Sequence, residues 1–366
     1  MAATSFAGTR RTVRSPVLSL AAWAAVAALY GTASAATPEP SDAIEAWVEG
    51  LPQPPEEASM ASGYRFARPA FDALLDLAGT RGGVVQLEVI GHSIGEAPLV
   101  AVHISDPTQP ITDDVLVVAG IHALEWVGTE SALALIDAHA RRPTPGVRLT
   151  VVPLANPDGR ARVESDLLTD NVGAYRRGNQ ALVDLNRDFE MGREAKAIWR
   201  HVLPMRFGTS PAPLSQPESR ALSALADRHP YRAVVSLHAF GGYLYHPFSS
   251  SWRRPEDWEG YVRTGRSMEQ AQGAGAFRTR QLARWGFFFR AHGTELDHFH
   301  RPDETQSWLL EISRSGLASP ADRKTPFRWY NPRRSTPHVK RTVAAVDALL
   351  DTGPRRIAAG TPHAHR

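Results

Sequence analysis

Four runs dominated by apolar residues constrain the fold of this chain more than any other feature. The runs are residues 114–119, 147–154, 233–237 and 308–312. Short runs in which apolar residues predominate are typical of strands that are buried on both faces. Helical patterns at 129–140, 217–228 and 259–272 occur between or beside them. Strands that alternate with helices predict an α/β domain with a central sheet covered by helices.

The remaining pattern predicts one domain. Further strands are expected at 86–90 and 99–104 and further helices at 68–78 and 337–350, whereas 156–193 is polar and loop-rich. There are no repeats and no change of composition that would mark a second domain. We therefore expect an N-terminal extension with the first helix over 36–84, one globular domain over 85–352 with a mixed, mostly parallel sheet, and a disordered tail over 353–366.

Composition excludes several classes of protein. The chain has 366 residues, of which 43% are hydrophobic and 22% charged, as in an ordinary globular protein. The formal net charge of +3 is small, and no basic stripe is interleaved with exposed aromatic residues, so we expect no nucleic-acid partner. The absence of cysteine excludes disulfides and a lipid-bearing cysteine. Oligomeric state is left open.

The first 35 residues have the pattern of a signal peptide. Arg10, Arg11 and Arg14 precede an apolar run over 17–30, and Ala33-Ser34-Ala35 then offers a cleavage site, which predicts a mature chain from Ala36. The alternative is a membrane anchor, but the run is shorter than the roughly 20 residues that a spanning helix needs. We therefore expect a secreted or periplasmic protein without stable membrane anchoring.

The export route is open between two alternatives. Paired arginines in Thr9-Arg10-Arg11 are compatible with twin-arginine export of a folded protein, and also with the general secretory route.

Metal-binding side chains follow two of the predicted strands. His122 and Glu125 come directly after the strand 114–119, and His238 ends the strand 233–237. Because ligands of open α/β sheets collect at the carboxyl ends of strands, these side chains are expected at the same edge. Two histidines and one glutamate suit a catalytic zinc ion, one per chain, that keeps a position open for water. The pair Asn186-Arg187 is suited to hold a carboxylate, so the pattern indicates metal-dependent hydrolysis of a substrate with a free acid.

The order of the motifs resembles the zinc carboxypeptidases of the A/B type over residues of about 85 to 350. The matching segments are Gly120-Ile121-His122-Ala123-Leu124-Glu125-Trp126, Asn156-Pro157-Asp158-Gly159, Tyr175-Arg176-Arg177, Asp184-Leu185-Asn186-Arg187-Asp188-Phe189, Ser236-Leu237-His238 and Trp308-Leu309-Leu310-Glu311. The resemblance implies a carboxypeptidase-like fold, with His122, Glu125 and His238 as the zinc ligands.

The resemblance also implies the catalytic roles. Glu311 corresponds to the general base that takes a proton from the zinc-bound water. Arg176 corresponds to the guanidinium that stabilises the oxyanion, with the adjacent Arg177 as the alternative. Asn186 and Arg187 correspond to the pair that binds the terminal carboxylate of the substrate.

Several positions depart from the family pattern. Leu124 replaces an arginine, and Phe289 stands where many members have a tyrosine that closes over the substrate. The specificity position falls at Leu296, which implies an apolar or aromatic C-terminal side chain. A slip of one residue would instead place Glu295 or Asp297 in the pocket and favour Lys or Arg.

The resemblance implies a carboxypeptidase that acts on the C-termini of peptides or proteins. Two alternatives stay open. One is an amidase or deacylase on the same scaffold, for instance acting on cell-wall peptides, and the other is a zinc-bound protein without activity.

Overall fold

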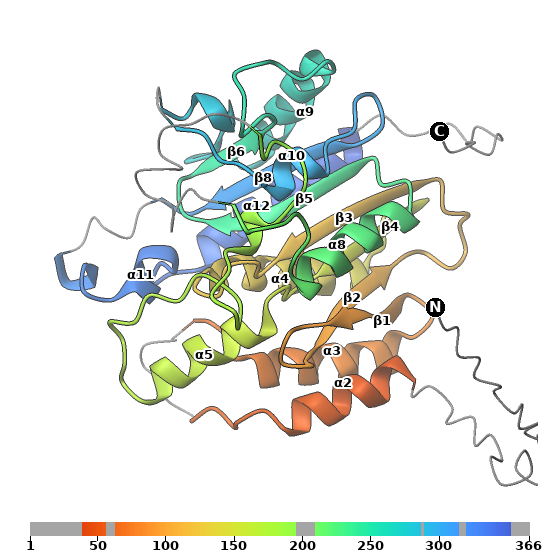
Figure 1. Ribbon diagram of the computed structural model, residues 1–366. Coiled ribbons are helices and arrows are strands. Elements are labelled where there is room, and N and C mark those ends of the chain that lie inside the picture. Colours follow the sequence, from red (N-terminus) through yellow and green to blue (C-terminus); the bar gives the residue numbers. More distant parts are fainter. Residues whose placement is uncertain (1–38, 56–62, 195–208, 287–288, 315–319, 353–366) are drawn as a thin grey trace, which may run out of the picture. The chain divides into compact units, whose positions relative to one another are not determined.

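The computed structural model describes residues 39–55, 63–194, 209–286, 289–314 and 320–352. The predicted signal peptide and the predicted C-terminal tail lie outside these residues. A sheet of eight strands forms the centre of the described fold, in the order β1-β2-β4-β3-β5-β8-β6-β7 (Figure 1). The strands are β1 Val85–His92, β2 Pro98–Ile104, β3 Asp113–Ala119, β4 Val147–Val152, β5 Ala233–Ala239, β6 Tyr243–His246, β7 Arg278–Gln281 and β8 Gln306–Ile312.

The sheet is mixed, as predicted. Strand β3 pairs in parallel with β4 and β5, β5 with β8, and β6 with β7. The pairs β1–β2, β2–β4 and β6–β8 are antiparallel. The parallel strands β4, β3, β5 and β8 form the middle of the sheet, so their carboxyl ends meet at one edge.

Helices cover both faces of the sheet. They are α2 Pro40–Glu49, α3 Ala67–Arg81, α4 Trp126–Arg141, α5 Pro157–Leu168, α8 Pro217–Arg228, α9 Trp258–Ala271, α10 Glu295–His298, α11 Pro326–Tyr330 and α12 Thr336–Thr352. Alternate residues of β3 enter different cores. Val115 and Val117 belong to the core that includes α4, α9 and α12, and Leu116 and Val118 belong to the core with α8, which lies in front of the sheet in Figure 1.

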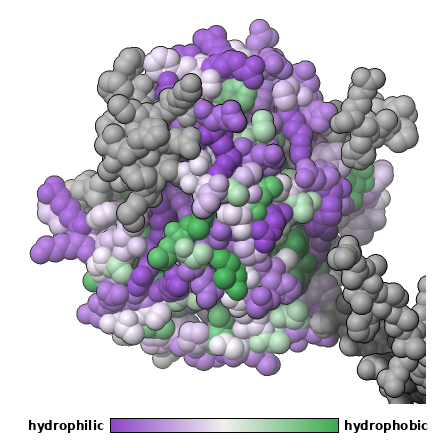
Figure 2. Space-filling view, viewed as in Figure 1, coloured by the Kyte–Doolittle hydropathy of each residue, from purple (hydrophilic) through white to green (hydrophobic). Residues whose placement is uncertain are grey.

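The N-terminal helices belong to the larger core. Ile44 and Val48 of α2 and Phe71 and Leu74 of α3 are buried in the same cluster as the residues of α4. The face seen in Figure 2 is mainly hydrophilic, with hydrophobic residues in small separate groups. Within the described part of the chain, none of the helices combines the length and the apolar character needed to cross a membrane.

Helix α5 forms within residues 156–193, for which the sequence predicts a polar, loop-rich segment and no helix. The side chain of Asn156 caps the helix by accepting a hydrogen bond from the backbone N–H of Gly159 at 2.9 Å. Arg160 and Glu164 are buried and form an ion pair at 2.8 Å within the helix. The face that α5 buries is therefore partly polar, and hydrophobic periodicity could not reveal it. The short strands β6 and β7 and the helix α2 were not predicted either.

Candidate metal centre and active site

The predicted metal ligands come together at the carboxyl edge of the parallel strands. His122 follows β3, His238 lies near the end of β5, and Glu125 is the N-cap residue of α4. A Cβ atom on Gly128 of α4 would lie 2.6 Å from the carbonyl oxygen of Leu237 in β5. Only glycine therefore permits the close approach of α4 to β5 that brings Glu125 beside His238.

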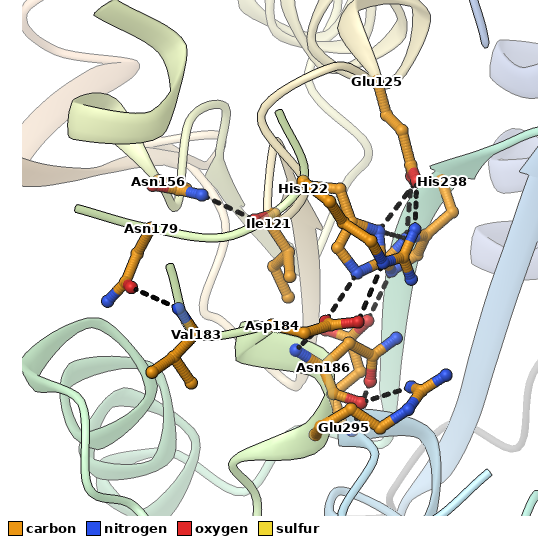
Figure 3. A network of polar contacts seen from close by, with 12 residues as sticks. Ile121, His122, Glu125, Asn156, Asn179, Val183, Asp184, Asn186, His238 and Glu295 are labelled. Atoms are coloured by element: carbon orange, nitrogen blue, oxygen red, sulfur yellow. Dashed lines mark hydrogen bonds and ion pairs between the residues drawn. The ribbon is translucent and has the colours of Figure 1, made fainter. Parts of the chain in front are cut away.

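Three side chains form a compact cluster of metal-binding atoms (Figure 3). Nδ1 of His122 lies 2.8 Å from Oε1 of Glu125. Nδ1 of His238 lies 3.0 Å from Nδ1 of His122 and 3.0 Å from Oε2 of Glu125. All three residues are buried. Atoms bound at about 2.0–2.1 Å to a tetrahedral zinc ion are about 3.3 Å apart, so the three groups are placed to share one ion.

A carboxylate holds the outer nitrogen of each histidine. The Nε2–H group of His122 donates to Oδ1 of Asp184 at 3.0 Å, and that of His238 donates to Oε1 of Glu295 at 2.5 Å (Figure 3). Each bond places a proton on Nε2 and turns Nδ1 towards the cluster, where it can bind a metal once it is deprotonated. Metal-binding histidines adopt this arrangement. The donor set and its surroundings therefore fit a zinc ion.

The charges of the cluster are balanced internally. Burial would raise the pKa of Glu125, but His122 and His238 lower it well below its ordinary range. Burial would lower the pKa of His238, but the carboxylates of Glu295 and Glu125 raise it to about 10. A bound cation would replace the proton on His238, so metal binding is expected to release a proton.

Glu311 faces the same site from the adjacent strand. In the parallel pairing of β5 and β8, Glu311 is the register partner of His238, and both side chains line the same pocket. Burial, and next the negative charge of Glu125, raise the pKa of Glu311 to about 8. A carboxyl group whose pKa lies in the neutral range is suited to accept and return a proton during a reaction.

The structure places Arg177, and not Arg176, in the site. The guanidinium of Arg176 bonds Asp166 at 2.7 Å and is not part of the pocket wall, so the expectation that Arg176 faces the metal is wrong. Arg177 lines the pocket, with Nη1 3.2 Å from Oε1 of Glu125 and Nε 2.8 Å from Oδ2 of Asp184. Burial would lower the pKa of Arg177, but these carboxylates raise it well above its ordinary value.

Asn186 and Arg187 line the same pocket as the metal cluster. Both are buried, and Nη1 of Arg187 donates to the backbone oxygen of Asn186 at 2.6 Å. The Oδ1 atom of Asn186 accepts from the backbone N–H of Glu295 at 3.0 Å, so the Nδ2 group is the donor end of the carboxamide. A guanidinium and an amide N–H in one pocket are a suitable pair for a carboxylate ligand.

The pocket has a volume of about 420 Å³. It is lined by His122, Arg177, Asn186, Arg187, His238, Ala239, Phe240, Gly241, Tyr243, Tyr245, Leu282, Trp285, Phe289, Ala291, Thr294, Leu309, Glu311 and Tyr330. Phe289 is therefore a wall residue of the pocket.

Leu296 does not line the pocket, which contradicts its predicted role as a direct specificity contact. Its side chain is fully buried in a cluster with Tyr245, Leu282 and Leu309, which are themselves wall residues. Leu296 lies on α10, where the residue that faces the pocket is Thr294, the N-cap. Leu296 therefore supports the apolar wall from behind.

The sequence does not predict the roles of Asp184 and Glu295, whose carboxylates bond the two metal-binding histidines. Asp184 opens a matched motif, yet only the structure shows that it holds His122. The sequence suggests Glu295 only as an alternative pocket residue, because no sequence pattern relates α10 to His238.

Comparison with known proteins identifies the family of the chain. A family model described as zinc carboxypeptidase matches residues 72–315. Bovine thrombin-activatable fibrinolysis inhibitor, solved with tick carboxypeptidase inhibitor, has a similar fold, with a TM-score of 0.64 and 18% identity over 80% of this chain and 98% of that one. Carboxypeptidase A from Helicoverpa armigera gives a TM-score of 0.61 and 16% identity over 86% and 80%.

A metallo-carboxypeptidase from Burkholderia cenocepacia is also similar, with a TM-score of 0.52 and 18% identity over 79% of this chain and 70% of that one. The TM-scores show a shared fold, and the family model covers more than half of the sequence. The resemblance inferred from the ordered motifs is thereby confirmed. The chain belongs to the zinc carboxypeptidase family and is a metallocarboxypeptidase.

Proposed function

We propose that the protein is an exported zinc-dependent carboxypeptidase that releases single apolar or aromatic residues from the C-termini of peptides. One observation carries the proposal. Asn186 and Arg187 line the same pocket as His122, His238 and Glu311. A group that binds a terminal carboxylate and a group that cleaves the adjacent peptide bond would thus act on one substrate.

Each residue of the site then has a chemical role. A zinc ion held by His122, Glu125 and His238 would polarise the scissile carbonyl and acidify a water molecule. Glu311 takes the proton of the attacking water and delivers it to the nitrogen of the leaving residue. Arg177 stabilises the negative charge that develops on the carbonyl oxygen.

The walls of the pocket support a preference for apolar side chains. Tyr245, Leu282, Phe289 and Leu309 contribute large hydrophobic groups to the wall. Among the described residues that line the pocket, the only carboxylate is that of Glu311. A C-terminal lysine or arginine would therefore enter without an acidic partner other than the catalytic base, and burying such an unpaired charge is costly.

A matched peptide series tests the proposal. Peptides of one sequence that end in Phe, Leu, Lys or Glu would be offered to the purified protein as free acids and as C-terminal amides, and products followed by mass spectrometry. We expect loss of the last residue from the Phe and Leu free acids, at least tenfold faster than from Lys or Glu. A chelator should stop the reaction and added zinc should restore it.

The other outcomes identify the alternatives. Cleavage of the amides as fast as the free acids would show an amidase or deacylase, in which the carboxylate clamp plays no part. A preference for Lys would show that a carboxylate other than that of Glu311 contacts the C-terminal side chain. No cleavage of any peptide by zinc-loaded protein would contradict the proposed activity.

Export is the second part of the proposal. Cleavage after Ala35 would leave helix α2 intact, because α2 begins at Pro40. N-terminal sequencing of the protein recovered outside the cytoplasm should therefore begin near Ala36. Recovery of the uncleaved chain from the cytoplasm alone would contradict export.

A further inference from the structure

Glu295 is a buried carboxylate between the metal cluster and the carboxylate-binding pair. It is the first residue of α10, and its side chain is 1% exposed. Oε1 accepts hydrogen bonds from Nε2–H of His238 at 2.5 Å and from Oγ–H of Ser236 at 2.7 Å. Oε2 is buried without a hydrogen-bond partner among the described residues. A buried carboxylate is costly, so its retention here calls for a role.

The contact with His238 determines which imidazole nitrogen of this residue can bind a metal. A neutral imidazole has one N–H group and one lone pair, so a carboxylate that accepts from Nε2–H leaves the lone pair on Nδ1. Nδ1 is the atom that faces His122 and Glu125. Asp184 acts in the same way on His122. Each histidine of the cluster thus has its own carboxylate partner.

The backbone of Glu295 contacts Asn186, one of the two residues proposed to bind the substrate carboxylate. Its N–H group donates to Oδ1 of Asn186 at 3.0 Å (Figure 3). This hydrogen bond orients the carboxamide of Asn186, which with Arg187 is proposed to bind the terminal carboxylate of the substrate. One residue therefore contacts both a metal ligand and a substrate-binding side chain. A shift of Glu295 would move both.

We propose that Glu295 is a positioning residue, which holds His238 in the tautomer and orientation that bind the metal and does not select the C-terminal side chain of the substrate. The proposal rests on the proposed function only in taking the cluster to bind zinc. Thr294 lines the pocket, whereas Glu295 is absent from its described wall. Its carboxylate is already engaged with His238 and Ser236.

The test compares zinc affinity in three variants. Glu295→Gln keeps the shape of the side chain and removes its charge, and Glu295→Ala removes the contact. Asp297→Asn is the matched control, because Asp297 is also a buried carboxylate of α10 but bonds Ser249 and Ser250 instead of a metal ligand. Zinc affinity would be measured by competition with a chromophoric chelator, and folding by thermal unfolding of the apoprotein.

We expect Glu295→Ala to weaken zinc binding about 10- to 100-fold, as loss of the group that orients a metal-binding histidine typically does. Glu295→Gln should weaken it less, because the amide oxygen still accepts from Nε2–H, and Asp297→Asn should change it less than twofold. In zinc-loaded Glu295→Gln, kcat should fall while the order of preference among C-terminal residues stays as in the wild type.

The decisive contrary result is zinc affinity within twofold of wild type in a folded Glu295 variant. If the alanine variant does not fold, the near-isosteric glutamine variant decides. A change in the ratio of the rates on Lys-ending and Phe-ending peptides in Glu295→Gln would also overturn the proposal, since Glu295 would then select the substrate. Zinc affinity is measured without substrate, so failure of the proposed peptidase activity would leave this test intact.

Discussion

The Nη1 atom of Arg177 lies 3.2 Å from Oε1 of the metal-binding residue Glu125. The neighbouring Arg176 points to Asp166, and its side chain is 37% exposed. Two adjacent arginines of the same motif thus have different surroundings. Substitution of Arg176 is therefore a matched control for substitution of Arg177, the proposed oxyanion-stabilising residue.

We expect Arg177→Gln to lower kcat/KM by about 10²- to 10³-fold, because a positioned donor at a developing oxyanion is worth about 3–4 kcal/mol. Arg176→Gln, which removes only an ion pair outside the pocket, should stay within threefold of wild type. Steady-state kinetics on one free-acid peptide, with zinc content measured for each variant, make the comparison. Equal losses in both variants, or a loss in Arg176→Gln alone, would show that the arginines are wrongly assigned.

Substitution of Arg187 tests the carboxylate clamp. Arg187→Gln should raise KM for a free-acid peptide by about 10- to 100-fold, because a hydrogen bond to a charged group contributes about 1.5–3 kcal/mol. The slow hydrolysis of the amidated peptide should change little, since that peptide has no terminal carboxylate for Arg187 to bind. If KM rises equally for the free-acid and the amidated peptide, Arg187 does not bind the terminal carboxylate of the substrate.

A buried histidine away from the site should make the protein sensitive to acid. His246 is 2% exposed, donates from Nδ1–H to the carbonyl oxygen of Pro247 at 2.8 Å, and packs against Trp258 and Tyr261. Burial lowers its pKa to about 4. Between that value and the unfolded pKa of about 6.5, the unfolded chain binds more protons, so stability is lost as pH falls through this window.

Wild-type protein should lose about 2 kcal/mol of unfolding free energy through His246 between pH 7.5 and pH 5. Chemical denaturation of His246→Asn at the two pH values should show a smaller loss by about that amount. His92→Asn, at an exposed position, is the matched control and should follow the wild type. An unchanged pH dependence in His246→Asn would refute this explanation.

The central strands could be predicted because their residues are buried on both faces. Val115 to Val118 are all buried, so the apolar run was a direct signal of the fold. The positions of two predicted metal ligands could be inferred from the same runs, because His122 and His238 come where such runs end. Helix α5 could not be predicted in this way, since Arg160 and Glu164 fill part of its buried face with an ion pair.

Finer assignments depended on side-chain directions that a sequence does not reveal. Spacing placed Arg176 and Leu296 at the site, yet the chain turns Arg176 to Asp166 and buries Leu296 behind Tyr245. Counting residues locates a segment to within about one position. One position is enough to change which side chain faces a pocket.

The most direct test of the account is the zinc content and turnover of Glu311→Gln. Glu311 lines the pocket but is not one of the three clustered ligands, so the amide should remove the base and leave the metal site intact. We predict one zinc ion per chain, as in the wild type, with kcat reduced at least about a thousandfold on a free-acid peptide. Wild-type turnover in the zinc-loaded variant would contradict the assignment of Glu311 as the general base.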